Sequence, residues 1–248
     1  QEPSVVIGHD CRFGGEMFAE TTAKVMADYG IKVFLAKGFV STPMISLGAL
    51  KLSSSLGVVI TASHNPYKDN GLKLFGPDGY KLSDDTELAL ENIIQNPDLI
   101  DLAAPQDIGR ATRIDDAPGR YIEFIKNSFP KGRRLDGMKV VIDCANGAAY
   151  HMGGKILWEL GAEVIEIAVN PTGKNINLNC GSNNLEKLSK AVIEHQADLG
   201  IALDGDADRI QMVDEHGNPV DGDHILALIA CYLKKHDRLA HNKIVATS

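Results

Sequence analysis

The chain alternates short runs of β-branched residues with helix-length amphipathic segments, and this alternation constrains its fold more than any other feature. Strands are predicted at Val5–Gly8, Lys32–Ala36 and Gly57–Ala62, separated by helices predicted at Glu16–Tyr29 and Thr42–Leu52. Strands separated by helices need crossover connections, which give a mostly parallel sheet. The order therefore predicts an α/β domain.

The next segments predict the edge of this domain and a connection to another. Gly71–Phe75 and Tyr80–Leu82 flank a Gly-Pro-Asp-Gly turn and predict a hairpin. Asp84 begins a further predicted helix. Asn96–Gly119 is rich in Pro, Asp and Gly, and we expect it to be a linker or surface loop.

A second alternating unit follows the linker. Its predicted elements are, in chain order, a helix at Arg120–Phe129, a strand at Met138–Asp143, a helix at Ala148–Leu160, a strand at Glu163–Val169, a helix at Leu185–Gln196, a strand at Asp198–Leu203, a hairpin of Ile210–Val213 with Val220, and a helix at Asp223–Leu239. The shared order hints at structural duplication. We expect two consecutive α/β domains with mostly parallel mixed sheets, residues 1–114 and 115–240.

Net charge and cysteine content exclude several classes of function. With 25 Lys and Arg against 33 Asp and Glu, the net charge of −8 excludes a nucleic-acid binder that works through bulk positive charge, and it gives no reason to expect a membrane partner. The longest apolar run, Ile225–Leu233, is far too short to cross a bilayer. The four cysteines form no CxxC pair, so we expect reduced cysteines in a cytoplasmic protein. The chain starts at Gln1 without a methionine, which we expect of a fragment.

Three aspartates alternate in Asp204–Arg209 (DGDADR), directly after the predicted strand Asp198–Leu203. Ligands of open α/β sheets bind at the carboxyl ends of strands. Carboxylates this close repel one another, and a hard cation such as Mg²⁺ removes the conflict. Arg209 adds a planar cation suited to a phosphate. The plain alternative is a solvated acidic turn.

Two other sites share part of this aspartate pattern. An EF-hand loop is excluded, because Arg209 stands where that loop needs glycine and strands flank the segment. A haloacid-dehalogenase-type site, with Asp204 as nucleophile, remains an alternative. Such a site normally continues with a Gly-Thr pair, whereas this chain has Ala207-Asp208.

A serine loop, Thr61–Pro66 (TASHNP), lies at the end of another predicted strand. Ser63 needs a base, a metal or nearby cations to act as a nucleophile, and His64, Lys73 and Arg12 are the candidates. No Gly-x-Ser-x-Gly elbow surrounds Ser63, which disfavours an acyl-transferring hydrolase. Alone, the loop is typical of a plain Asx-capped turn. Facing a metal loop, it indicates phosphoryl transfer.

Together, the two loops resemble the phosphoserine loop and the metal loop of the α-D-phosphohexomutases. Further similar stretches are Tyr67–Lys73 (YKDNGLK), Gly119–Phe124 (GRYIEF), Val141–Tyr150 (VIDCANGAAY), Asn175–Gly181 (NINLNCG) and Asp221–Asp223 (DGD). These stretches cover nearly the whole chain. Within the superfamily, the chain most resembles the bacterial branch that acts on glucosamine phosphates.

The resemblance implies a reversible phosphomutase. Ser63 would carry a phosphoryl group and pass it to a hexosamine phosphate substrate, giving glucosamine 1,6-bisphosphate as intermediate and activator. That intermediate would reorient and return its other phosphate. Asp204, Asp206 and Asp208 would hold Mg²⁺ together with an oxygen on Ser63.

The resemblance also implies roles for the residues around these loops. Arg209 would contact the phosphate, and Lys73 and Arg12 would help to move protons at the sugar hydroxyl. Arginine has a very high pKa, so we expect Arg12 to stabilise charge first and move protons second. His64 and Asn65 would orient the loop, with Asn65 also near the phosphate.

Several family features are absent from the sequence. The sugar-recognition motif Gly-Glu-x-Ser-Gly-His, the phosphate-binding motif Arg-x-Ser-Gly-Thr and the opening Gly-Thr-x-Gly-x-Arg do not occur. Family members have four domains, and the resemblance assigns residues 1–114 to most of the first, 115–240 to the second and 241–248 to the start of the third. We therefore expect the chain alone to be inactive as a mutase. A mannose- or glucose-phosphate mutase and a catalytically incompetent module remain alternatives, and a homodimer is compatible with the resemblance.

Overall fold

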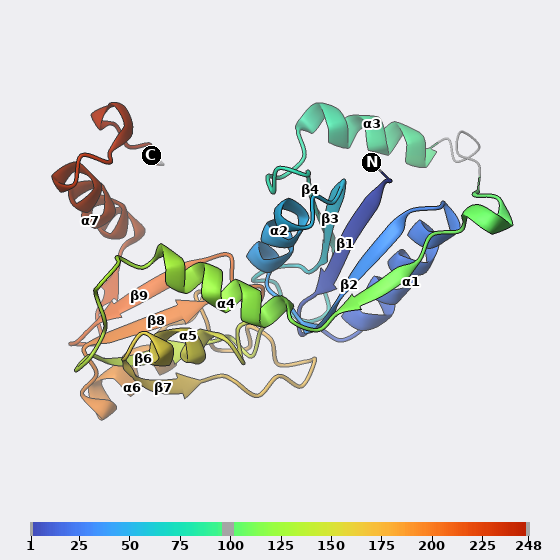
Figure 1. Ribbon diagram of the computed structural model, residues 1–248. Helices are drawn as coiled ribbons and strands as arrows, with labels where there is room; N and C mark the ends of the chain where they lie inside the picture. The colour runs from blue at the N-terminus through green and yellow to red at the C-terminus, as the bar shows by residue number, and fades with distance from the viewer. Residues whose placement is uncertain (1, 96–101, 247–248) are drawn as a thin grey trace.

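The computed structural model describes residues 2–95 and 102–246, which form two α/β units in succession (Figure 1). The first unit has a five-stranded sheet of order β4-β3-β1-β2-β5. Its strands are β1 (Ser4–His9), β2 (Lys32–Phe39), β3 (Leu56–Ile60), β4 (Leu72–Phe75) and β5 (Ala111–Ile114). Only β4 runs antiparallel to its neighbour. The sheet is therefore mixed and mostly parallel, as the sequence predicts.

Helices cover both faces of this sheet, because residues of each central strand alternate between the faces. Val5 and Ile7 of β1 pack in a cluster with residues of α1 (Gly15–Asp28), whereas Val6 packs in a cluster with residues of α2 (Thr42–Lys51). A further helix, α3 (Asp84–Gln95), has no buried side chain.

The second unit repeats this plan. Its sheet has the order β10-β9-β8-β6-β7, in which β6, β7 and β8 are parallel and β9 and β10 antiparallel. The strands are β6 (Lys139–Asp143), β7 (Glu163–Ile167), β8 (Leu199–Leu203), β9 (Ile210–Asp214) and β10 (Pro219–Val220). The helices are α4 (Ala117–Ser128), α5 (Gly153–Glu159), α6 (Glu186–His195) and α7 (Gly222–Lys235). Short 3₁₀ turns lie at Pro105–Asp107 and Ala240–Asn242.

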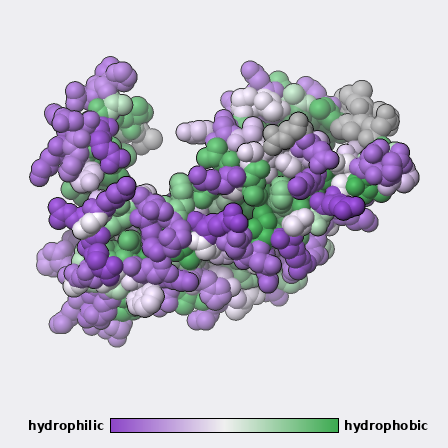
Figure 2. Space-filling model, viewed as in Figure 1, coloured by the Kyte–Doolittle hydropathy of each residue, from purple (hydrophilic) through white to green (hydrophobic). Residues whose placement is uncertain are grey.

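One hydrophobic cluster runs through both units. It joins residues of α2, such as Ile45, to Tyr121 and Ile122 of α4 and to Ile142 and Met152 of the second unit. Figure 1 shows α4 lying between the two units. By contrast, α7 has no buried side chain, and the surface is deeply notched between the α7 segment and the first unit (Figure 2). Within the described residues, no helix is long and apolar enough to cross a membrane.

The predicted linker Asn96–Gly119 is wrong over its second half. Residues Ala111–Ile114 form the edge strand β5, which pairs in parallel with β2, and α4 already begins at Ala117. Three of the four β5 residues are exposed, so the strand lacks the apolar signal of its neighbours. Residues 96–101 lie outside the described part, and the boundary at residues 114 and 115 stays a prediction.

Other predicted elements are shorter in the structure. The helix predicted at Ala148–Leu160 begins only at Gly153, because the residues before it form tight turns, in which Tyr150 N donates to the Gly147 carbonyl and Met152 N to the Ala149 carbonyl. The predicted strand Tyr80–Leu82 contributes a single bridge between Lys81 and Phe75. The last predicted helix ends at Lys235.

Candidate active site

Ser63 lies in the loop that follows β3, and its hydroxyl points at the second unit. Ser63 Oγ donates a hydrogen bond of 2.7 Å to Asp204 Oδ2, although the two residues are 141 positions apart. The backbone of Ser63 is left-handed, with φ of 53°. Few residues other than glycine adopt this conformation, and it concentrates at functional sites. The serine loop and the aspartate loop therefore meet, as the sequence predicts.

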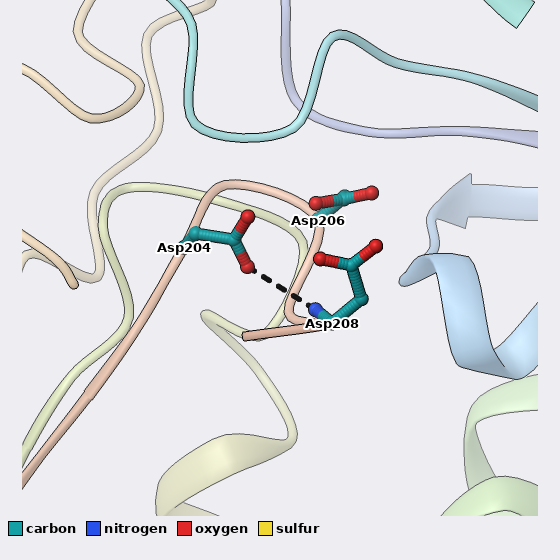
Figure 3. Close-up of side chains that lie close together, drawn as sticks. All are labelled: Asp204, Asp206 and Asp208. Atoms are coloured by element: carbon teal, nitrogen blue, oxygen red, sulfur yellow. Dashed lines mark hydrogen bonds between the residues drawn. The ribbon is translucent and has the colours of Figure 1, made fainter. Parts of the chain in front are cut away.

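The three aspartates follow β8 and converge (Figure 3). One oxygen from each of Asp204, Asp206 and Asp208 lies within 4.8 Å of the other two. Asp204 Oδ1 accepts hydrogen bonds from the backbone amides of Asp208 and Arg209, at 3.1 and 3.0 Å. These bonds close the loop back on its first carboxylate. Because strands β8 and β9 flank it, the loop is not an EF-hand.

Lys73 supplies the positive charge that this acidic cluster needs. It lies on β4, and its Nζ donates to Asp206 Oδ2 at 2.8 Å and to Asp208 Oδ2 at 2.6 Å. Burial alone would lower the pKa of Lys73, but the hydrogen bonds from Nζ to Asp206 and Asp208 hold it above its ordinary value. Lys73 is therefore an ammonium that offsets the repulsion between the carboxylates.

The two buried aspartates differ in their electrostatics. Burial raises the pKa of Asp204, and the hydrogen bond from Ser63 only partly opposes it. Burial would also raise the pKa of Asp206, but hydrogen bonds from Lys73 and Thr42 outweigh it and hold that pKa below its ordinary value. Asp206 is thus the carboxylate best prepared to stay ionised.

Thr42, the first residue of α2, orients Asp206 from the other unit. Its hydroxyl donates to Asp206 Oδ2, and its backbone amide donates to the carbonyl of Asp206 at 3.0 Å. The sequence predicts Thr42 only as the start of a helix. Thr42 follows the carboxyl end of β2, on the same sheet edge as Ser63, and this position could have identified it as a candidate site residue.

The donor set fits a hard divalent cation. Mg²⁺ prefers a few carboxylate oxygens and usually adds phosphate or water ligands. Asp206 Oδ1 is buried and has no hydrogen-bond partner among the described residues. A buried carboxylate oxygen in that state is costly unless a ligand satisfies it. Three carboxylates and one unsatisfied buried oxygen are consistent with a magnesium site.

Arg12 is buried and contacts Asp10 and the serine loop. Its Nε donates to Asp10 Oδ2 at 2.8 Å, and its terminal nitrogens donate to backbone carbonyls of the serine loop. The acceptors are the carbonyl oxygens of Ser63, Asn65, Pro66 and Asp69, at 2.7 to 3.1 Å. Its side chain has no exposed surface. These contacts make Arg12 a support for the loop, and its role at the sugar stays a prediction.

The remaining predicted residues lie around the same loops. His64 Nδ1 is buried and has no partner within the described part of the chain. Asn65 donates to Asp69 Oδ2 at 3.1 Å and is half-buried. Arg209 is exposed beside the aspartate loop. His64 and Asn65 directly follow Ser63 in the serine loop, and the Arg209 amide bonds to Asp204. The phosphate-binding and orienting roles of these three residues stay predictions.

Two residues that the sequence analysis missed support the serine loop. Asp10 follows β1, accepts from Arg12, and accepts from the Thr61 hydroxyl at 2.6 Å. Asn177, from the second unit, donates to the carbonyl oxygens of Ser63 and Asn65 at 2.9 and 3.2 Å. The sequence marks Asn175–Gly181 only by its similarity to the family, which does not predict a contact with Ser63.

A cavity of about 650 Å³ opens beside the acidic cluster, between α2, β4 and α3. Lys73 and Asp208 border it, together with apolar side chains such as Leu72 and Phe75. The acidic cluster is therefore accessible from this side.

Comparisons with known proteins agree with this geometry. Residues 1–101 match the sequence profile of phosphoglucomutase/phosphomannomutase, alpha/beta/alpha domain I. Residues 119–217 match the profile of alpha/beta/alpha domain II of the same family. The first match contains Ser63 and the second contains the three aspartates.

Curated relatives carry the resemblance through nearly the whole chain. The chain is 54% identical over 243 residues to the phosphoglucosamine mutase of Zymomonas mobilis, covering 98% of this chain and 54% of that protein. It is 50% identical to the phosphoglucosamine mutase of Rhodospirillum centenum, covering 98% of this chain and 52% of that protein. The chain thus spans about half the length of the curated relatives that it matches.

Solved structures share the fold. A phosphoglucomutase/phosphomannomutase family protein from Burkholderia thailandensis superposes with a TM-score of 0.81 at 26% identity, over 94% of this chain and 51% of that one. The phosphoglucomutase parafusin from Paramecium superposes with a TM-score of 0.72 at 18% identity, over 94% of this chain and 49% of that one. With two consecutive family domains and a serine loop that meets an aspartate loop between them, the chain belongs to the phosphoglucomutase/phosphomannomutase family, the α-D-phosphohexomutases.

Proposed function

We propose that this chain carries the phosphoryl-transfer site of a phosphoglucosamine mutase. In the complete protein, this enzyme would interconvert glucosamine 6-phosphate and glucosamine 1-phosphate. Ser63 would carry the phosphoryl group, and glucosamine 1,6-bisphosphate would be the intermediate. The observation that carries the proposal is the 2.7 Å hydrogen bond from Ser63 Oγ to Asp204, which joins a nucleophile to a metal-type carboxylate cluster.

The choice of sugar rests on the comparisons. Identity to the phosphoglucosamine mutases of Zymomonas mobilis and Rhodospirillum centenum is 54% and 50%, compared with 26% to the solved Burkholderia protein of the wider family. A mutase acting on mannose or glucose phosphates is the alternative within the same family. The sugar-recognition motifs of the family do not occur in the 248 residues, so we propose that this chain transfers phosphoryl groups but needs further residues to grip the sugar.

The chemistry is an exchange of two oxygen–phosphorus bonds. The bond between Ser63 Oγ and phosphorus breaks as a sugar hydroxyl oxygen bonds to phosphorus. The sugar hydroxyl loses its proton, and Ser63 Oγ gains one, so protons balance. In the reverse half-reaction, the other phosphate of the bisphosphate returns to Ser63.

The residues around Ser63 would have different roles in this transfer. Asp204, Asp206 and Asp208 would hold Mg²⁺, which supplies Lewis-acid stabilisation of phosphoryl oxygens when bound. Lys73 is held as an ammonium, so it can stabilise negative charge and donate a proton, but it cannot accept one in this state. Arg12 donates to the loop carbonyls and so holds the backbone of the serine loop in place, while Ser63 Oγ bonds to Asp204.

We further propose a cytoplasmic location. All four cysteines are free, and burial raises the pKa of the Cys180 thiol to about 11, so it stays protonated and unreactive. Free thiols are typical of a reducing compartment.

Labelling with glucosamine 1,6-bisphosphate and Mg²⁺ tests the proposal. We expect the intact mass of the chain to rise by one phosphoryl group, and peptide mapping to locate it on Ser63. Ser63→Ala removes the only proposed acceptor and is expected to abolish labelling. A phosphoryl group on Asp204, or labelling that persists in Ser63→Ala, would instead support the dehalogenase-type alternative.

A further inference from the structure

We propose that Asn177 is a positioning residue for Ser63, holding the nucleophile's backbone so that its hydroxyl faces the aspartate loop. The inference deepens the proposed function and rests on Ser63 being the phosphoryl carrier. Within the described part of the chain, the Asn177 side chain hydrogen-bonds neither the three carboxylates nor the serine hydroxyl, and it acts through the backbone of the serine loop.

Asn177 and Arg12 grip the same two carbonyl oxygens from opposite units. Arg12 donates to the carbonyl of Ser63 at 2.7 Å and to that of Asn65 at 3.1 Å. Asn177 Nδ2 donates to the same oxygens at 2.9 and 3.2 Å. A carbonyl oxygen has two lone pairs, so the two donors saturate each acceptor. The peptide planes of Ser63–His64 and Asn65–Pro66 are thereby fixed.

This grip matters because the Ser63 backbone is strained. A left-handed φ at a non-glycine residue costs free energy and persists only where the surroundings over-determine it. The amide of Ser63 donates to the Thr61 hydroxyl at 3.0 Å, which fixes the residue from its N-terminal side. The donors on its carbonyl fix it from the C-terminal side. Without Asn177, Arg12 would be the one side chain among the described residues that holds that carbonyl.

Asn177 is itself rigidly built into the second unit. Its backbone amide donates to the carbonyl of Ala145 at 2.9 Å. The buried carboxylate of Asp143, the last residue of β6, accepts from the amides of Ala145 and Gly181 at 2.8 and 2.9 Å. It thereby fixes the backbone of both Ala145, which binds the Asn177 amide, and the segment that follows Asn177. The carboxamide that reaches Ser63 therefore moves with the second sheet.

Gly205 shows how closely these groups pack against the aspartate loop. A Cβ placed on Gly205 would lie 2.7 Å from Asn177 Nδ2 and 2.8 Å from the carbonyl oxygen of Ser63. The Asn177 side-chain amide and the Ser63 carbonyl oxygen therefore both pack closely against Gly205 of the aspartate loop. Because Asn177 and Asp204 both belong to the second unit, they align Ser63 with the carboxylates as a pair.

The test compares Asn177→Gly with Asn179→Gly in the full 248-residue chain. Both asparagines are left-handed, with φ of 58° and 52°, and glycine tolerates that conformation, so the backbone cost of the two changes is matched. Asn179 is exposed, and no hydrogen bond of its side chain occurs among the described residues. The measurements are the maximal rate of Ser63 labelling by glucosamine 1,6-bisphosphate, the Mg²⁺ affinity by calorimetry and the Ser63 backbone carbon chemical shifts by NMR.

We expect Asn177→Gly to slow maximal labelling by about 10- to 100-fold, because small losses of alignment have costs of this size. The Ser63 shifts are expected to move away from left-handed values, while Mg²⁺ affinity and the thermal midpoint stay equal to those of Asn179→Gly. A labelling rate equal to that of the control, or unchanged Ser63 shifts, would overturn the proposal.

Two further arms separate the possible failures. If the unsubstituted chain is not labelled, the proposed function fails, and the Ser63 shifts alone decide whether Asn177 positions the loop. If Asn177→Gly does not fold, Asn177→Asp replaces it, with Asn179→Asp as its control. A carboxylate keeps the size of the side chain but cannot donate to carbonyls, so the same shift of Ser63 is expected.

Discussion

Lys73 is the single residue whose contacts most restrict what the acidic cluster can do. Its ammonium bonds both Asp206 and Asp208, at 2.8 and 2.6 Å. A divalent cation on the same carboxylates would meet this positive charge at close range. The lysine and the metal therefore compete for the negative charge of the cluster, even though both suit a phosphoryl-transfer site.

This competition predicts the effect of Lys73→Met, which keeps the aliphatic stem and removes the charge. The dissociation constant for Mg²⁺ is expected to fall on the order of 10-fold, because close charges interact strongly at partly buried sites. Lys81→Met is the matched control, since Lys81 is exposed and its ion pair within the described residues is with Glu87, away from the acidic cluster. Calorimetry measures both variants. Weaker Mg²⁺ binding by Lys73→Met would mean that the lysine organises the cluster instead of competing for it.

At the scale of elements, the site is a meeting of loops that follow strands of both sheets. The loop after β6 packs directly on the aspartate loop after β8. The amide of Ala148 donates to the carbonyl of Gly205 at 2.8 Å, and a Cβ on Gly147 would lie 2.3 Å from that oxygen. Backbone meets backbone at this contact, so no flexible side chain can move aside.

Gly147→Ala therefore forces the two loops apart. We expect the free energy of unfolding to fall by about 1–3 kcal/mol, the usual range for an overpacked interior. Gly119→Ala serves as the control, because a Cβ there meets nothing within 4 Å and the residue lies in α4. Alanine favours a helix over glycine by up to about 1 kcal/mol, so the control is expected to be neutral or stabilising. Urea denaturation measures both, and equal stability of the two variants would contradict the tight contact.

The periodic elements could be predicted from the sequence, and the contacts between loops could not. Central strands such as β1 and β6 are buried runs of β-branched residues, which carry a strong signal. The edge strand β5 is mostly exposed, so its sequence carries no such signal and predicts a loop instead. The rule that ligands bind at strand ends singled out the loops of Ser63 and Asp204, and the structure brings these two residues together. It could not say that Asn177 reaches across to Ser63, because that contact depends on how the second unit docks.

The contacts of Arg12 are another example of loop contacts that the sequence could not predict. The sequence places an arginine just after a strand end, which suits a ligand contact. Asp10, two residues earlier, instead folds back as a buried acceptor for the Arg12 amide and Nε, at 2.9 and 2.8 Å. A short-range turn thus directs the guanidinium inward to the serine loop.

At the scale of the whole molecule, the two units are related by the same strand order. The neighbouring strands β4-β3-β1-β2 of the first sheet correspond, in spatial order, to β9-β8-β6-β7 of the second. Ser63 follows β3 and the aspartate loop follows β8, so the two halves of the site occupy corresponding positions. The shared hydrophobic cluster through α4 holds these two strand ends together. The site exists only where both units meet.

The central claim is therefore that Ser63 and the three aspartates form one site, and its most direct test is a calorimetric Mg²⁺ titration. The chain is prepared with serine or with incorporated phosphoserine at position 63. A phosphoserine adds roughly 1.5 to 2 negative charges and strong acceptor oxygens beside the carboxylates. We expect phosphorylation to tighten Mg²⁺ binding on the order of 10-fold, because the phosphate becomes a further oxygen ligand. Equal affinity of the two forms would contradict the account, since it would mean that the serine loop and the aspartate loop do not share a metal.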